Sequence, residues 1–358
     1  MGTNGTSPTV TIGNNGNWFI NGEDTGEIAV GVNGVDSPTI TSIVQLDDKF
    51  IFYFSDGTNI EVNYIPNFKP CYISYSLDGS ADSKELFIIF VQNEANPKYY
   101  FGFEVGHEYN LNDIIYTNQY RLIKAPIYEY DGNSMNRIGE NALVGGESEF
   151  VYRAENRDDF TGGIHGDEKF TEINFFADGV RLTKVDLASN FDLLPCTNFS
   201  YIQKSTLHET AKGGISNPLH PIEAIHHKKT EFNKSGYTTN NRIIWQANLS
   251  ISIGYLSLSS ISKDFGGKGY VTDNYIINDF DEQGGNKLSG PYNNAYMWNE
   301  ELNNSSEVKS VFDTNDNFAN QFIWDTTEYN KYYRNIGKRL VENNEEWNSN
   351  TIVKFLKR

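Results

Sequence analysis

Apolar and polar residues alternate with a period of two along much of this chain, and that period predicts β-strands. The clearest run extends from Trp245 to Leu258, where apolar side chains alternate with Gln, Asn, Ser and Gly. Another runs from Phe170 to Leu182 and is interrupted by Asp178-Gly179, a dipeptide typical of hairpin turns. Further antiparallel strands are expected at 71–75, 86–91, 99–105 and 120–130.

Few stretches show a helical period. We expect one helical turn at 113–116, with Asn112 as its cap, and a short helix that contains Ile336 and Leu340. Composition supports the dominance of strands, because aromatic residues form 14% of the chain and favour pleated sheets. The predicted fold class is therefore all-β: a small N-terminal β-hairpin module followed by a larger antiparallel β-sandwich of jelly-roll-like type.

Glycines and prolines divide the 358 residues into three parts. The first part holds short strand signals between many glycines and ends in a hairpin signal from Phe50 to Val62. Because so short a segment buries little apolar area, we expect it to pair with copies of itself or with a neighbour. Prolines at 66 and 70 mark a linker. The expected parts are a connector or trimerising β module at 1–64, a small antiparallel β region at 65–140 and the β-sandwich at 141–358.

The formal net charge of −18 argues against several classes of function. A protein that grips nucleic acid through its phosphates needs a basic face, so no nucleic-acid partner is expected. No apolar run reaches the length of a membrane span, so no membrane insertion is expected. The first residues lack a basic and then apolar leader, which suits a protein that has lost its leader or one carried in a virion. Cys71 and Cys196 form neither a disulfide framework nor a metal pattern and are expected as buried thiols.

Glycines, an imidazole and carboxylates crowd into the segment 161–168. His165, Asp167 and Glu168 lie on this Gly-rich turn directly before a strand signal, as polar groups do at the rim of a binding site. The alternative interpretation is a surface loop whose histidine caps a turn.

A second candidate site lies in a basic island of this acidic chain, where four of the six histidines fall within twenty residues. If 224–232 is a strand, its side chains point alternately to two faces. One face then carries His226, Lys228 and Thr230, and the other carries His227, Lys229 and Glu231. An imidazole and an ammonium on one face can hold a sugar carboxylate and exchange a proton near neutral pH.

We therefore predict an acid/base site whose catalytic candidates are His165, Glu168, His226 and Lys228. An exposed His-Lys strand without chemistry is the alternative. The histidines at 220 and 226 lack the helical spacing of the zinc proteases, so neither a metal nor another cofactor is expected.

Four further side chains are expected to contact a sugar. Tyr152 and Arg153 lie close to glutamates, and Tyr, Arg and Glu together can bind sugar hydroxyls. Asp167 lies beside the catalytic candidates, and Trp298 belongs to a stretch rich in aromatic residues and Asn. Aromatic rings also fill sandwich cores, and charged residues also coat solvent-facing strands, so core and surface roles are the alternatives.

The N-terminal string carries a resemblance to a known kind of module. The segments are SPTVTI at 7–12, GNNGNWFINGEDTG at 13–26 and FSDGT at 54–58. Together they resemble a short module of Bacteroidota surface proteins and of tail fibres of the phages that infect them. The resemblance covers about residues 7–64 and implies a connector or trimerising stalk. Residues 140–350 are more weakly similar to large β-sandwich domains of phage tail proteins, some of which have polysaccharide-cleaving relatives.

These observations predict a phage tail fibre or tail-associated protein that recognises a bacterial surface glycan. Its expected partners are a bacterial surface polysaccharide and other tail proteins, its expected assembly is a homotrimer, and its expected location is the virion tail. One alternative is a polysaccharide-degrading lyase or hydrolase on the tail. The others are a carbohydrate-binding protein on a bacterial cell surface and a purely structural tail protein.

Overall fold

The computed structural model describes residues 9–29, 38–45, 49–63, 69–77, 83–111, 116–210, 220–273, 275, 277–281, 286–312 and 320–358. The chain folds as two compact units, Met1–Asn67 and Phe68–Arg358. The helical turn expected at 113–116 falls almost entirely on residues outside these ranges. No helix within them has the length and apolar character needed to cross a lipid bilayer.

The first unit consists of two small antiparallel sheets. Their strands are β1 (Val10–Ile12), β2 (Asn17–Ile20), β3 (Glu23–Ile28), β4 (Ile40–Gln45), β5 (Lys49–Phe54) and β6 (Asn59–Asn63). The expected hairpin is confirmed: β5 and β6 pair around Gly57, whose φ of 84° suits glycine. Phe52, Phe54 and Ile20 form a small buried cluster.

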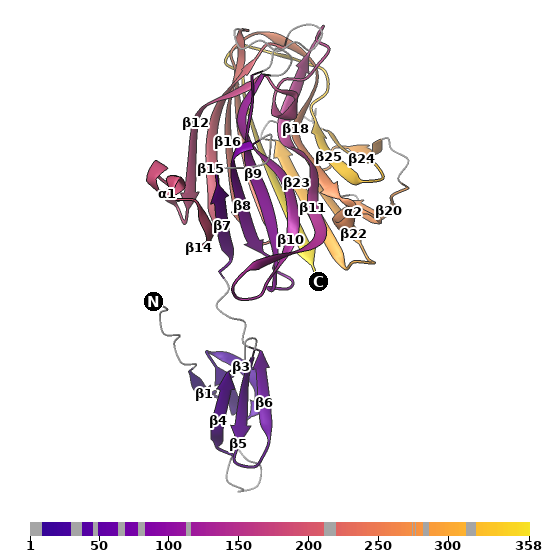
Figure 1. The fold of residues 1–358 in the computed structure, drawn as a ribbon. Helices are drawn as coiled ribbons and strands as arrows, with labels where there is room; N and C mark the ends of the chain where they lie inside the picture. The colour runs from indigo at the N-terminus through magenta and orange to yellow at the C-terminus, as the bar shows by residue number, and fades with distance from the viewer. Residues whose placement is uncertain are drawn as a thin grey trace. The chain divides into compact units, whose positions relative to one another are not determined.

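The second unit is an antiparallel β-sandwich (Figure 1). Its first sheet has the order β14-β7-β8-β9-β10-β11-β18-β25-β24-β21. These strands are β14 (Phe191–Cys196), β7 (Cys71–Ser76), β8 (Ser83–Gln92), β9 (Tyr99–Leu111), β10 (Tyr116–Tyr130), β11 (Met135–Ala154), β18 (Leu249–Ser262), β25 (Tyr329–Asn335), β24 (Asn320–Asp325) and β21 (Asn286–Gly290).

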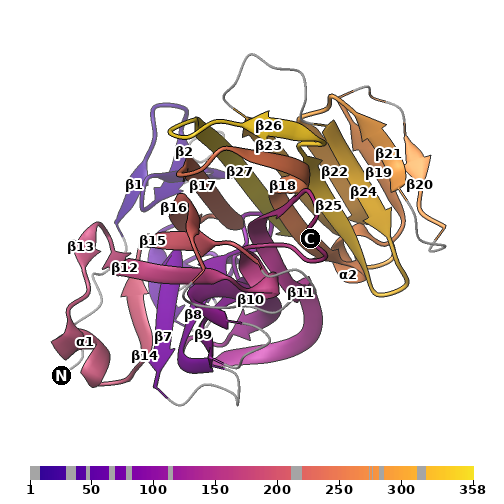
Figure 2. The same cartoon turned by 90° about the horizontal axis from the view of Figure 1, so that it is seen from above.

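The second sheet has the order β12-β15-β16-β17-β27-β23-β22-β19-β20 (Figure 2). These strands are β12 (Glu168–Ala177), β15 (Phe199–His208), β16 (Ile222–Asn233), β17 (Gly236–Trp245), β27 (Glu346–Lys357), β23 (Asn304–Phe312), β22 (Asn294–Asn299), β19 (Gly269–Thr272) and β20 (Asn278–Asp279). The short elements are β13 (Val180–Arg181), β26 (Arg339–Val341), η1 (Gly163–His165), α1 (Lys184–Ala188) and α2 (Lys263–Gly266). A short parallel pairing of β10 with β12 joins the two sheets.

The predicted all-β fold is confirmed, and so is the hairpin of β12 and β13 at Asp178-Gly179. The pairing of β10 with β11 places the expected regions 65–140 and 141–358 in one unit. Cys71 and Cys196 are buried free thiols, as expected, and the register of β7 and β14 makes them direct neighbours.

Two expectations about local structure are wrong. The alternating run from Trp245 to Leu258 is not one strand, because the chain leaves the second sheet after β17 and enters the first sheet as β18. The alternation continues across this break because both strands direct apolar side chains into the same interior. The expected helix is instead a non-helical link from β25 into the strand β26, with Ile336 buried directly after β25 and Leu340 75% exposed on β26.

Aromatic side chains from both sheets meet in the interior. The Phe103 ring on β9 lies 5.3 Å from that of Phe232 on β16 and 5.7 Å from that of Tyr237 on β17. A second apolar cluster lies around Trp245, where the Trp347 ring is 5.0 Å away. Both sheets thus pack through two separate apolar clusters, and the polar site described below lies between them.

Replacing Phe103 with alanine is expected to lower the free energy of unfolding of the second unit by about 3–5 kcal/mol, since its ring is fully buried between the sheets. Denaturant titration measures this loss. The matched control is Val180→Ala at a position 70% exposed, which should change the stability by less than about 0.5 kcal/mol. Equal effects of the two substitutions would contradict the described packing.

Candidate functional site

A belt of buried polar side chains separates the two apolar clusters of the sandwich. On β16, for example, Phe232 belongs to one cluster and Ala224 to the other, while His226 and Lys228 lie between them. The neighbouring strands β15, β17 and β27 repeat this order on their inward faces. The buried members of the polar belt include Gln119, Glu168, Gln203, Ser205, His226, Lys228, Asn241, Ser257 and Ser349.

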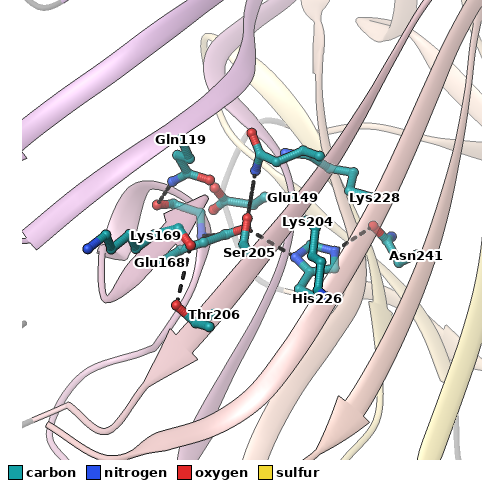
Figure 3. Close-up of polar contacts among 12 residues, drawn as sticks. Gln119, Glu149, Glu168, Lys169, Lys204, Ser205, Thr206, His226, Lys228 and Asn241 are labelled. Atoms are coloured by element: carbon teal, nitrogen blue, oxygen red, sulfur yellow. Dashed lines mark hydrogen bonds and ion pairs between the residues drawn. The ribbon is translucent and has the colours of Figure 1, made fainter. Parts of the chain in front are cut away.

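An ion pair between Glu168 and His226 lies at the centre of the polar belt (Figure 3). His226 Nδ1 is 3.2 Å from Glu168 Oε1, and His226 Nε2 is 2.9 Å from Asn241 Oδ1. Both ring nitrogens thus lie within hydrogen-bond distance of side-chain oxygens. Burial alone would raise the pKa of Glu168, but His226, Lys228 and the Ser205 hydroxyl together lower it to about 2. Glu168 is therefore a buried carboxylate that the His226 ring, the Lys228 ammonium and the Ser205 hydroxyl stabilise.

Lys228 supplies the second cation. Its ammonium donates to the carbonyl oxygen of Tyr120 at 3.0 Å and lies 5.8 Å from the centre of the Tyr201 ring. Only 5% of the residue is exposed. A buried ammonium is stable only when hydrogen bonds and opposite charge replace its water, and here a backbone oxygen and Glu168 do so.

Glu149 is a second buried carboxyl group beside the belt. The backbone N–H of Ile164 donates to its Oε2 at 2.7 Å, and the N–H of Gly163 donates to Oε2 of Glu168 at 3.3 Å. The turn η1 thus holds both carboxyl groups. Gly163 has a φ of 54°, and a Cβ there would lie 1.8 Å from Glu149 Oε2, so only glycine fits.

The two carboxyl groups differ in charge because their surroundings differ. Oε1 of Glu149 is buried and has no hydrogen-bond partner among the described residues. Burial raises the pKa of Glu149 to about 8, although the Ile164 N–H and Arg121 oppose this shift. Near neutral pH, Glu149 is therefore mainly protonated whereas Glu168 is ionised.

The space inside the polar belt is small. A cavity of about 10 Å³ is lined by residues that include Glu149, Lys228, Tyr237 and Asn241. That volume suffices for about one water molecule. A sugar ring does not fit, so the belt as folded can position a water and hold charge but cannot receive a polysaccharide.

Three of the four catalytic candidates therefore come together, namely Glu168, His226 and Lys228, but they do so in the interior. His165 lies apart from them: its Nδ1 is 3.3 Å from Asp159 Oδ1, and its ring is 5.0 Å from that of Phe160. Burial lowers the pKa of His165, although Asp159 opposes this shift. No hydrogen bond or ion pair in the described ranges joins His165 to the other three. Their acid/base role stays a prediction.

The expected sugar contacts are placed on several parts of the sandwich. Tyr152 is fully buried and donates from its hydroxyl to Glu223 at 2.7 Å, and Asp167 is buried and accepts from the Thr210 hydroxyl at 3.0 Å. The Arg153 guanidinium lies 5.2 Å from the centre of the Phe160 ring. Trp298 is partly exposed on β22. Of these, only Arg153 and Trp298 have surface that a ligand can reach.

The outward face of the second sheet carries a groove of about 450 Å³, the outer groove. It crosses β15, β16, β17, β27 and β23. The outward side chains that line it are Ile202, His227, Lys229, Asn240, Arg242, Val311, Asn348 and Asn350. His227 and Lys229 reach it because they alternate with the buried His226 and Lys228 on β16.

Basic side chains form a row at one side of the outer groove. The register aligns Lys204 of β15 with His227 of β16 and His227 with Arg242 of β17. Neighbouring strands are about 4.8 Å apart, so the three groups lie within about 10 Å of sheet. Arg242 pairs with Glu346 at 2.7 Å, whereas neither the Lys204 ammonium nor the His227 ring has a hydrogen-bond or ion-pair partner within the described ranges.

The pKa of His227 depends on the electrostatic potential at this side of the outer groove. Partial burial lowers it from 6.5, and the cations of Lys204 and Arg242 lower it further, while Glu346 opposes the shift. A histidine whose pKa falls because of neighbouring cations lies in a positive field. This part of an acidic protein is therefore suited to an anion.

A second row of side chains crosses the outer groove beside the basic row, and the two residues at its centre are uncharged asparagines. The register runs through Ile202, Lys229, Asn240, Asn350 and Val311. The Asn350 amide donates to Asn240 Oδ1 at 2.8 Å, and Lys229 pairs with Glu231 at 2.9 Å. Ile202 and Val311 are 38% and 39% exposed and leave an apolar surface at either end of this row.

The alternation along β16 predicted its two faces, and the structure places the catalytic candidates His226 and Lys228 on the buried one. The sequence pattern did not single out Asn240, Arg242, Asn348 or Asn350. A signal for them existed in the alternation of β17 and β27, where each Asn or Arg is separated from the next by a buried residue. Among the residues described, no three His, Cys, Asp or Glu side chains converge as a metal site requires.

Comparison with known proteins adds little. No protein-family model matches this chain, and no curated protein matches it. Among solved structures, the Slr1438 protein of Synechocystis sp. PCC 6803 is similar with 10% identity and a TM-score of 0.33, over 84% of this chain and all of that one. Heparan sulfate lyase HepC of Pedobacter heparinus is similar with 11% identity and TM-scores of 0.29 and, for a mutant, 0.31. The match covers 85% of this chain but only 38% of that enzyme. TM-scores below 0.5 do not establish a common fold, so no activity is transferred to this chain.

The two buried carboxyl groups are expected to respond oppositely to replacement by glutamine. Glu168→Gln should lower the free energy of unfolding near neutral pH by about 3–5 kcal/mol, because it leaves buried cations without their counter-charge. Glu149→Gln should raise it by more than about 1 kcal/mol, because the folded protein no longer has to keep that carboxyl protonated.

The pH dependence of unfolding gives the matching signature. The pKa of Glu149 is raised from 4.5 to about 8 on folding, so folding binds a proton and stability falls as the pH rises through that window. The pKa of Glu168 is lowered from 4.5 to about 2, so its contribution is lost as the pH falls through that lower window. Urea titrations across both pH windows measure how the free energy of unfolding changes with pH. If the Glu149→Gln protein still loses stability between pH 4.5 and about 8 as the unsubstituted protein does, the raised pKa does not belong to Glu149.

Proposed function

We propose that the second unit binds an acidic bacterial surface polysaccharide along the outward face of its second sheet and holds it without cutting it. The observation that carries the proposal is the basic row of the outer groove. Neither the Lys204 ammonium nor the His227 ring forms an ion pair within the described ranges, although Glu172 lies opposite Lys204 and Glu346 acts on His227. Arg242 extends the row on a third adjacent strand. Such a row attracts carboxylate or sulfate groups repeated along a polymer.

The rest of the outer groove suits a sugar chain. Asn240, Asn348 and Asn350 carry amide groups that both donate and accept hydrogen bonds, as sugar hydroxyls require. Ile202 and Val311 provide exposed apolar surface on which the carbon skeleton of a sugar ring can lie. All of these side chains project from paired strands, so the site is largely formed before a ligand arrives.

Cleavage is not part of this proposal, because the acid/base candidates do not face the outer groove. A general acid or base must come within hydrogen-bond reach of the proton that it moves. Glu168, His226 and Lys228 are buried on the other side of the sheet, where the cavity that Lys228 lines has only about 10 Å³. The charges of these three residues stabilise one another. A structural role therefore explains why they are buried here, and no catalysed reaction is needed to explain it.

The biological setting is part of the same proposal and rests on the N-terminal sequence. The resemblance of residues 7–64 to modules of Bacteroidota surface proteins and phage tail fibres favours a tail fibre or tail-associated protein, with attachment to the host as its role. A trimer through the first unit fits that setting. A bacterial surface location is the second possibility, and both settings need the same glycan recognition.

Binding is tested by affinity measurement with acidic and neutral bacterial polysaccharides, alginate and dextran being the reference probes. Alginate is expected to bind, more weakly at high salt, and dextran is not. Lys204→Ala and Arg242→Ala should each weaken alginate binding by about tenfold or less. The control is Arg137→Ala, which removes an exposed arginine from β11 of the other sheet. Shortened alginate chains, equal binding of dextran, or equal effects of all three substitutions would overturn the proposal.

Affinity for alginate is expected to rise as the pH falls below about 6.5. A bound carboxylate favours the charged imidazolium of His227, so binding takes up a proton and is strengthened by acid. Calorimetry over a pH series measures this slope, and His227→Gln should abolish it while leaving binding at higher pH nearly unchanged. A slope of the opposite sign, or one that survives in His227→Gln, would remove His227 from the site.

A further inference from the structure

An aromatic pair lies on the same outward face as the outer groove, on β22. Tyr296 is 37% exposed and Trp298 is partly exposed, while their neighbours Ala295 and Met297 are fully buried. The two ring centres are 5.9 Å apart and the ring planes meet at 32°. The pair therefore forms a nearly continuous aromatic surface, here called the aromatic platform.

Trp298 lies over the backbone of the neighbouring strand. A Cβ placed on Gly269 of β19 would be only 2.6 Å from Cζ2 of Trp298. The indole thus occupies the position that a side chain of β19 would otherwise fill, which orients the ring along the sheet. Its N–H has no hydrogen-bond partner in the described part of the chain. An amphipathic ring in this orientation can offer its face to a sugar ring and its N–H to a hydroxyl.

The aromatic platform and the outer groove lie too far apart for one small ligand. The register pairs Trp298 with Ser305 of β23, whereas Val311 of the same strand lies at the groove. Six residues of strand correspond to about 20 Å. A single sugar cannot contact both places, but a chain of several sugars can.

The path between the two places is basic. Lys309 on β23 and Lys354 on β27 both project outward and are exposed. Neither ammonium has an ion-pair partner among the described residues. Glu307 also lies on this path, so the charges alternate partly, but the balance is positive. The path therefore matches a chain that carries repeated negative charge.

We propose that Tyr296 and Trp298 form a second subsite and that the ligand is an extended acidic polysaccharide spanning the aromatic platform and the outer groove. This inference rests on the proposed function and narrows it: the protein selects long chains over short fragments. Two weak subsites on one chain reinforce each other, because binding at the first raises the effective concentration of sugar at the second.

The test compares long alginate chains with alginate tetrasaccharides. The unsubstituted protein should bind the long chains at least about tenfold more tightly per chain. Trp298→Ala should weaken binding of long chains by about tenfold and leave tetrasaccharide binding at the outer groove unchanged. Tyr296→Ala should act in the same direction, and it removes an exposed ring that does not cover Gly269. The control is Trp324→Ala on β24 of the other sheet, where Trp324 is 42% exposed.

The outcomes separate the two proposals. If both chain lengths bind equally and neither aromatic substitution matters, the second subsite is overturned while the proposed function stands. If Trp298→Ala lowers stability and weakens both lengths alike while Tyr296→Ala changes neither, Trp298 only covers Gly269 and the second subsite is overturned as well. If the unsubstituted protein binds neither length, both proposals are overturned.

Discussion

The buried ion pair between Glu168 and His226 is the constraint on which the site depends. It decides which face of β16 points inward, since a strand that buries His226 and Lys228 must expose His227 and Lys229. A slip of one residue would bury His227 and Lys229 in their place, but it would also bury Glu231 and expose Phe232, which packs between the sheets. The polar belt and the apolar clusters together fix the register of the second sheet, and the outer groove is the outward consequence of that register.

The two faces of β16 carry charged side chains in different surroundings. Inside, Glu168, His226 and Lys228 are buried and held by one another, beside a cavity that Lys228 lines and that admits about one water molecule. Outside, the Lys204 ammonium and the His227 ring are partly exposed and form no ion pair within the described ranges. Charges that are satisfied internally stabilise the fold, whereas charges left unsatisfied at a groove attract a partner. That difference, more than the kinds of residue, separates the buried face of β16 from the face that we propose binds a ligand.

Period-two patterning was enough to predict the all-β class, the hairpin at Asp178-Gly179 and the two faces of β16. It could not say which face is buried, because both faces of β16 carry one His and one Lys. The answer depends on Glu168 and Asn241, which are brought to His226 by β12 and β17. Nor could the pattern show that β17 and β18 belong to different sheets, since alternation continues through residues 246–248. Contacts between distant strands, which local sequence does not encode, decide both matters.

The most direct test of the account is to follow the two adjacent histidines by NMR while alginate is added. His227 lies at the outer groove and His226 lies in the interior, on opposite faces of β16. Their resonances therefore distinguish a ligand bound in the outer groove from a reaction in the interior. The account predicts that the pKa of His227 rises on binding, that the His226 resonances stay unchanged and that the alginate chains keep their length. Perturbed His226 resonances together with shortened chains would contradict it, because the ligand would then have reached the interior.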